Sequence, residues 1–172
     1  MPARIRRLAL LALAVLLAGC SSGGDRLTSD AVLRERFEQH RAAFDSLAAA
    51  AVADTGLLSV RRVASLSMYV RGGATGDSLL TEEGIRATGR SHYERLLADA
   101  GVDGFSRQGS EPRVSFVLST NGRLLKGLVH TWEPLDPQRP SLDGLEAAGS
   151  PPTAYVSIAP GWYLFVEPTA ED

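Results

Sequence analysis

Three histidines are the residues of this chain best suited to hold a metal ion. His40, His92 and His130 fall on three different predicted elements, and imidazole nitrogens are common zinc ligands. His40, however, lies between Phe37 and Phe44 on an apolar stripe, where a hydrogen-bonded core histidine is the ordinary outcome. We therefore predict no metal site and no bound cofactor.

Two glutamates could form a pair of carboxylates for acid–base chemistry. Glu35 and Glu38 share one face of a predicted helix. Arg34 and Arg41 lie beside them, so the pattern favours a solvated, ion-rich helix face over a catalytic pair.

Asp99 and Asp103 are spaced like the first residues of a calcium-binding loop. The third position of that loop is Gly101 and the twelfth is Ser110, so the charge and the bidentate carboxylate that calcium requires are missing. The segment is better explained as the turn that ends a helix. The sequence also contains no nucleophile elbow, no His-Glu-x-x-His and no phosphate-binding loop. We predict no catalytic residues.

Aromatic side chains gather toward the C-terminus and could line a groove for a glycan or a peptide. They are Trp132, Tyr155, Trp162, Tyr163 and Phe165, with Arg113, Lys126 and His130 as polar neighbours. Packing in the core of a small domain is the favoured explanation for these rings. If a binding surface exists, we expect it around Lys126, His130 and Trp132.

The N-terminus has the organisation of a secretory signal peptide. Arg4, Arg6 and Arg7 precede an apolar run from Leu8 to Ala18, which is too short to span a bilayer. The only cysteine of the chain, Cys20, lies where this run meets a Ser/Gly tract. Two alternatives are an uncleaved anchor and an ordinary secretory peptide cut at small residues.

The sequence Leu17-Ala18-Gly19-Cys20 resembles the lipobox of bacterial lipoproteins. The resemblance implies cleavage before Cys20 by signal peptidase II, a diacylglyceryl group on its thiol and a further acyl chain such as palmitate. It also implies residence in the cell envelope. Ser21, which is not Asp, favours the outer membrane facing the periplasm over the inner membrane.

Cleavage after residue 19 leaves 153 of the 172 residues, enough for one domain. It removes three arginines, so the formal net charge changes from −2 to −5 and nucleic acid is not an expected partner. The expected partners are the membrane, through the acyl chains on Cys20, and an envelope protein or small ligand.

We predict four segments: a signal peptide (1–19), the lipidated cysteine with a tether (20–28), one α+β domain (29–168) and a tail (169–172). The predicted domain has two amphipathic helices packed on one face of an antiparallel sheet. Its general character resembles that of small uncharacterised bacterial lipoproteins, a likeness that implies no activity.

Two segments have the three- and four-residue apolar spacing of amphipathic helices. The first runs from Ser29 to about Ala53, is capped by Ser29 or Asp30, and should bury Leu33, Phe37, Phe44, Leu47 and Ala51. The second runs from Thr81 to Ala100 and should bury Ile85, His92 or Tyr93, Leu96, Leu97 and Ala100.

The strongest strand signal is a hairpin from Arg113 to Trp132. Asn121-Gly122 between two β-type runs predicts a two-residue turn, because both residues tolerate positive φ. In that register the facing pairs on the core side are Leu118 with Leu125, Phe116 with Gly127, and Val114 with Val129. Lys126 and His130 then belong to the mixed, opposite face.

The other segments give weaker signals. We predict one or two strands in 57–71, a loop in 101–112, a Pro-rich connection in 133–152 that is either mobile or a binding loop, and a hairpin in 153–167 around Pro160-Gly161.

The sequence as a whole favours a membrane-tethered binding or structural protein without catalysis. The alternative is an envelope hydrolase with dispersed catalytic residues and His130 as its base, which lacks a convincing nucleophile with an orienting acid.

Overall fold

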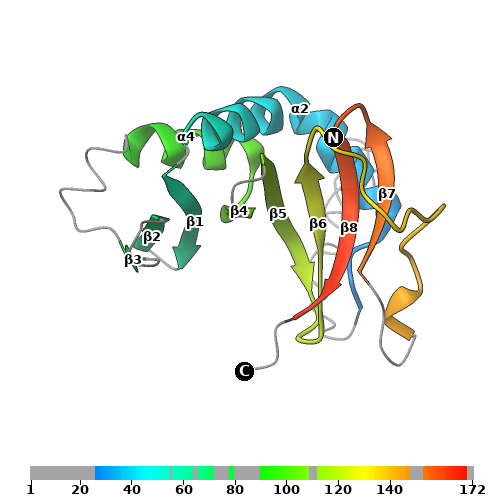
Figure 1. Ribbon diagram of the computed structural model, residues 1–172. Helices are drawn as coiled ribbons and strands as arrows, with labels where there is room; N and C mark the ends of the chain where they lie inside the picture. Colours follow the sequence, from blue (N-terminus) through cyan, green and yellow to red (C-terminus); the bar gives the residue numbers. More distant parts are fainter. Residues whose placement is uncertain are drawn as a thin grey trace, which may run out of the picture.

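The computed structural model in Figure 1 has an α+β fold, as the sequence predicts. It describes residues 26–54, 56–63, 66–71, 78–79, 90–108, 112–147 and 153–169. The elements are α2 (Asp30–Ala53), β1 (Leu57–Val63), β2 (Leu66–Arg71), β3 (Ser78–Leu79), α4 (Arg90–Ala100), β4 (Gly104–Gln108), β5 (Arg113–Thr120), β6 (Leu124–His130), the 3-10 turn η1 (Leu145–Ala147), β7 (Ala154–Ala159) and β8 (Trp162–Pro168). The predicted signal peptide and Cys20 lie outside the described residues.

The described strands form one sheet in the order β3-β2-β1-β4-β5-β6-β8-β7, and every neighbouring pair is antiparallel. β1 and β2 confirm the expectation of strands in 57–71.

The predicted loop 101–112 is wrong in part, because β4 lies within it and joins β1 to β5. Gly104 makes this pairing close: a Cβ there would lie 2.2 Å from the Val60 carbonyl oxygen. Pairing on both sides outweighs the loop-like composition of this short segment.

Helix α2 follows the prediction closely. Ser29 occupies the N-cap position with extended backbone, and its carbonyl accepts from the Leu33 amide (3.1 Å). The expected side-chain cap is wrong, because Ser29 makes no capping hydrogen bond and the Asp30 carboxylate binds residues that are distant in the sequence. All five expected apolar positions are buried: Leu33, Phe37, Phe44, Leu47 and Ala51. The helix bends at His40, whose φ of −116° and ψ of 17° are not helical.

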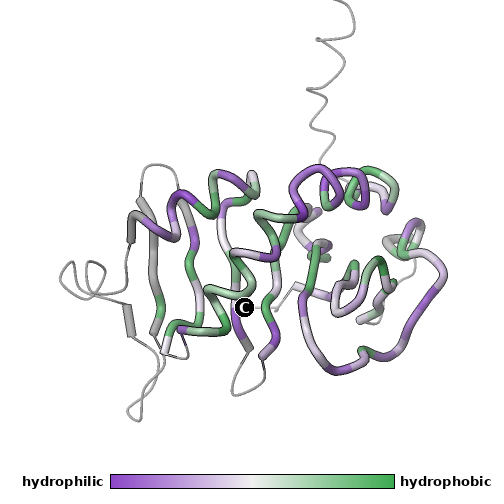
Figure 2. The backbone as a smooth tube through the Cα atoms, turned by 90° about the horizontal axis from the view of Figure 1, so that it is seen from above, coloured by the Kyte–Doolittle hydropathy of each residue, from purple (hydrophilic) through white to green (hydrophobic). Residues whose placement is uncertain are grey.

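Helix α4 is described from Arg90, so the predicted first turns in 81–89, with Ile85, lie outside the described residues. Tyr93, Leu97 and Ala100 are buried, Leu96 is half-buried and His92 is exposed. Gly101 ends the helix with φ of +65°, a conformation that suits glycine at this position. Seen from above, the helical turns alternate between hydrophobic and hydrophilic colours, as amphipathic helices do (Figure 2).

The predicted hairpin forms, but its register is wrong by one residue. Val114 faces His130 and Phe116 faces Leu128, and the register shifts again between Val117 and Ser119. The predicted centre of the turn, Asn121-Gly122, is also wrong by one residue: the Asn121 amide donates to the Leu124 carbonyl (3.3 Å), so the turn centres on Gly122-Arg123. The Asn121 side-chain oxygen accepts from the amides of Arg123 (3.1 Å) and Leu124 (2.9 Å) and stabilises this turn.

The corrected register exchanges the two faces of β6. Leu124 and Leu128 belong to the main core with α2, whereas Val129 belongs to a second cluster with Tyr155 and Phe165. Lys126 shares the face of Leu124 and Leu128, because side chains two residues apart point to the same side of a strand.

Aromatic rings form the centre of the main core. The ring of Phe44 lies 5.4 Å from that of Phe116 and 6.0 Å from that of Trp162, and Phe37 lies 5.1 Å from Trp162. Edge-to-face and tilted contacts of this kind stabilise ring clusters beyond the burial of their area. Helix α2 is thereby fixed to β5 and β8.

The Pro-rich connection after β6 is ordered in its described part. The Tyr155 amide donates to the Pro137 carbonyl (3.1 Å), and the Arg139 amide donates to the Tyr155 carbonyl (2.8 Å). The connection therefore covers the outer edge of β7, which would otherwise present unpaired backbone groups. The C-terminal hairpin around Pro160-Gly161 is confirmed, with Gly161 at φ of +74°.

Candidate functional site

The three residues of the predicted binding surface lie in different environments. Lys126 is buried, with 1% of its side chain exposed, so its expected place on an open surface is wrong. His130 is half-buried at the end of β6, and Trp132 just beyond it is 62% exposed. His130 and Trp132 remain as candidates, whereas Lys126 belongs to the interior.

Lys126 is held by two carboxylates that are distant in the sequence. Its Nζ lies 2.7 Å from Asp30 Oδ1 and 2.8 Å from Asp143 Oδ1. Asp30 Oδ2 accepts from the Ser141 hydroxyl and the Leu142 amide, both at 2.8 Å. Burial alone would raise the pKa of Asp30, but Lys126 and these donors together lower it. The cluster joins the start of α2, the middle of β6 and the loop before η1.

His130 lies between two tryptophans. Its ring is 4.7 Å from the exposed Trp132 in an edge-to-face contact, and 4.8 Å from the buried Trp162. The Trp162 indole donates to Asp45 Oδ1 (2.9 Å), and Asp45 also approaches Arg41 at 3.9 Å. Arg41, Asp45, His130 and Trp132 thus form one accessible surface, here named the His130 patch.

The environment of His130 favours its neutral form. Burial lowers the pKa of this imidazole, and the nearby Asp45 carboxylate opposes the shift only in part. The buried Nδ1 of His130 has no hydrogen-bond partner among the described residues. The patch can therefore offer an exposed aromatic face, a neutral imidazole and a flanking pair of opposite charges to a bound molecule.

The sequence did not predict the part that Arg41 and Asp45 take in this patch. The available signal was their spacing of four residues, which allows an ion pair on α2. Their proximity to His130 depends on the packing of α2 against β8, which no local pattern encodes.

The other aromatics of the predicted groove do not line one. Tyr155 and Phe165 are buried in the second cluster, and Tyr163 packs against that cluster while half-buried. The Arg113 guanidinium lies over the Tyr155 ring and donates to its hydroxyl. Burial raises the pKa of Glu167, while Arg113 opposes that shift. The rings of Tyr155, Tyr163 and Phe165 pack in the core, as the favoured explanation predicts, whereas that explanation is wrong for the exposed Trp132.

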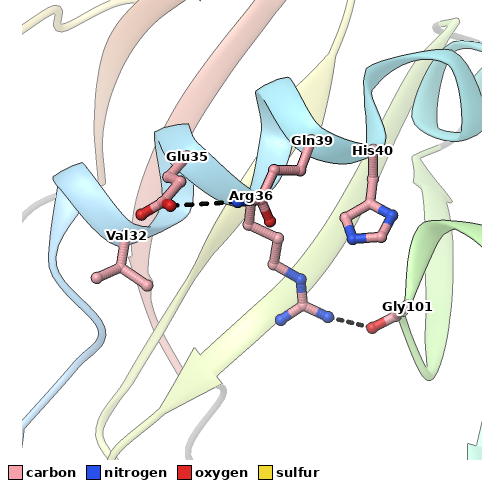
Figure 3. A pocket seen from close by; sticks show the side chains of 6 residues that line it. All are labelled: Val32, Glu35, Arg36, Gln39, His40 and Gly101. Carbon is pink, nitrogen blue, oxygen red and sulfur yellow. Dashed lines mark hydrogen bonds between the residues drawn. The ribbon is translucent and has the colours of Figure 1, made fainter. Parts of the chain in front are cut away.

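A shallow groove of about 480 Å³ runs between α2 and the end of α4 (Figure 3). Its lining residues are Val32, Glu35, Arg36, Gln39, His40 and Gly101. Arg36 donates to the Gly101 carbonyl, and His40 Nδ1 lies 3.0 Å from the Asp99 carbonyl oxygen. Arg36 and His40 of α2 thus bind backbone carbonyls at the C-terminal end of α4, where the helix dipole favours a positive charge. His40 is thus half-buried at the bend of α2, and its expected place in the apolar core is wrong.

The other residues considered as metal ligands lie apart from one another. His40, His92 and His130 lie at separate places on α2, α4 and β6. Among the described residues, no three His, Cys, Asp or Glu side chains are grouped so that they could hold a metal ion. Asp99 and Asp103 are both exposed, and Ser110 lies outside the described residues.

Comparison with known proteins finds no protein family, no curated protein and no solved structure that matches this chain. None of the described helices is both long enough and apolar enough to cross a membrane.

Proposed function

We propose that this protein is a lipid-anchored envelope protein that binds a partner protein or small ligand through the His130 patch, without catalysis. The observation that carries the proposal is the exposed indole of Trp132, which the ring of His130 supports from one side. A large exposed ring that is already positioned loses little conformational entropy on binding, and tryptophan is enriched among residues that dominate binding energy.

The lipid anchor rests on the resemblance of Leu17-Ala18-Gly19-Cys20 to a lipobox. Acylation of Cys20 would hold the domain permanently at a membrane, because two or more acyl chains anchor a protein stably. Ser21 favours the periplasmic face of the outer membrane. The anchored domain would then meet periplasmic molecules through its exposed patch.

One feature of His130 supports the hydrolase alternative, and another argues against it. His130 has a lowered pKa and a carboxylate nearby, which suits a general base. Its Nδ1, however, lacks the carboxylate hydrogen bond that orients a catalytic histidine. Binding is therefore the better-supported function.

The proposal also includes the position of the two helices relative to the sheet. We infer that α2 and α4 cover the same face of the sheet. Phe44 of α2 contacts Phe116, Tyr93 of α4 contacts Phe105 at 5.6 Å, and these two strand residues lie 6.4 Å apart. The face with Val117 and Tyr163 is then the one away from the helices.

Crosslinking in intact cells tests the proposed function. A photoreactive phenylalanine derivative replaces Glu133, the exposed neighbour of Trp132, in one variant and Val117 in the other, because Val117 is also exposed, at 43%, but lies outside the patch. We expect a discrete crosslinked product from position 133 only. Trp132→Ala should reduce that product while the thermal midpoint stays close to that of the parent chain, because the indole is exposed.

Three results would contradict the proposal. Equal crosslinking from positions 117 and 133 would exclude the patch as the specific site. Turnover of an envelope substrate that His130→Ala abolishes would favour the hydrolase. Mass spectrometry of the mature N-terminus that finds an unmodified Cys20 thiol would refute the lipid anchor.

A further inference from the structure

We propose that one end of the sheet, formed by Leu27, Thr28, Ser119 and the turn 121–124, faces the lipid surface, and that the His130 patch points away from it. We name this the turn end. The inference rests on the proposed acylation of Cys20 and adds an orientation to it.

The chain enters the domain at the turn end. Leu27 is 9% exposed within the main core, and the Thr28 amide donates to the Ser119 hydroxyl at 3.0 Å. Asp30, two residues later, is fixed by Lys126 and Asp143. These contacts connect the first described residues rigidly to β5 and β6.

The segment between the lipid and the domain is therefore short. Leu27 and Thr28 belong to the folded domain, so at most residues 21–26 remain as a tether, instead of the segment up to residue 28 that the sequence suggests. Six residues span at most about 20–22 Å when extended. The average end-to-end distance of a Gly/Ser-type linker of six residues is about 12–15 Å. The turn end cannot leave the neighbourhood of the headgroups.

The surface of the turn end suits this position. Arg26 and Arg123 are both exposed there, and guanidinium groups bind lipid phosphates well. Lys126 of the same region is already neutralised by Asp30 and Asp143. The end of β8 reaches this place too, because the Thr169 amide donates to the Arg123 carbonyl (2.8 Å).

The His130 patch lies at the other end of the strands. β6 runs from Leu124 at the turn end to His130, and its seven residues span about 20 Å. The Thr131 amide donates to the Gly161 carbonyl (2.9 Å), which places the patch beside the β7–β8 turn. Figure 1 shows the β5–β6 turn and the β7–β8 turn at opposite ends of the sheet. The exposed indole of Trp132 is thus directed to an aqueous partner and does not insert into the membrane.

Site-specific fluorescence quenching tests the orientation in the acylated full-length protein. The protein is reconstituted in phosphatidylcholine vesicles that contain lipids with a nitroxide on the headgroup. Acylation blocks the Cys20 thiol, so a thiol-reactive dye labels only the cysteine of Arg123→Cys or of Pro160→Cys, which are exposed positions on the two turns. We expect quenching several-fold stronger at position 123 than at position 160.

A longer tether provides the matched control. Inserting about twelve Gly and Ser residues after Gly24 triples the length of the segment and should bring the two positions close to equal quenching. Equal or reversed quenching with the native tether would overturn the orientation while leaving the lipid anchor intact. A mature chain without acyl groups, seen by mass spectrometry before reconstitution, would overturn both.

Discussion

Lys126 Nζ lies 2.7 Å from Asp30 Oδ1 across 96 positions of sequence, and both side chains are almost completely withdrawn from solvent. An unpaired charge in such a place is costly, so each residue stabilises the fold mainly by neutralising the other. The pair connects the first turn of α2 to the centre of β6. It thereby fixes the point at which the chain enters the domain.

Lys126→Met should therefore destabilise the domain by about 3–5 kcal/mol, because the Asp30 carboxylate is left buried without its cation. Adding Asp30→Asn should recover part of this loss, since the unpaired charge disappears. Arg123→Met, at an exposed position, serves as the control and should change the free energy of unfolding by less than about 0.5 kcal/mol. Urea unfolding of the chain without residues 1–20 measures all three. A Lys126→Met variant as stable as the control would refute the role of the ion pair.

His130 should give the domain a pH-dependent stability just below neutrality. Burial lowers its pKa in the folded state, so the unfolded chain binds the proton more readily. Stability should then decrease as the pH falls below the ordinary histidine value of about 6.5, and the loss should stop below the folded pKa. In His130→Gln this part of the pH dependence should be absent, and thermal midpoints of both proteins between about pH 5 and 8 provide the test. Identical profiles would contradict the prediction.

Gly127→Ala should be severely destabilising although alanine is normally tolerated in strands. A Cβ at this position would lie 1.9 Å from the Phe116 carbonyl oxygen, inside the irregular part of the β5–β6 pairing. The backbone must shift to accept it, and we expect a loss of about 2–4 kcal/mol or failure to fold. Ser157→Ala, exposed on β7, is the matched strand control. Equal unfolding midpoints for the two variants would show that the strands can move apart freely.

The hairpin turn should depend on Asn121 and Gly122 in different ways. Gly122 has φ of +84°, so Gly122→Val should cost about 1–3 kcal/mol through backbone strain. Asn121→Ala should cost about 0.5–1.5 kcal/mol, because two backbone amides lose their side-chain acceptor. Asn121→Asp retains an acceptor and should be close to neutral. Denaturant unfolding of the three variants distinguishes these effects. A larger loss of stability for Asn121→Ala than for Gly122→Val would contradict the prediction that the positive φ of Gly122 is the main constraint on the turn.

Local sequence patterns determined the elements of this protein. The apolar spacing of Leu33, Phe37 and Phe44 predicted the buried stripe of α2, and glycine at 101 marked the end of α4, because helix periodicity and helix ends are local properties. The proposed lipid anchor likewise rests on a few consecutive residues up to Cys20. Strand β4 was missed because its short sequence carries little signal without the neighbours that pair with it.

Tertiary structure alone decided the register of β5 and β6 and the candidate site that depends on it. A shift of one residue moves every side chain of a strand to the other face, and here it placed Lys126 inside the domain instead of on a surface. The interior accepts this lysine only because Asp30 and Asp143 arrive from distant segments. The His130 patch forms for the same reason: Asp45 of α2 reaches the end of β6 only when the aromatic core packs the helix against β8.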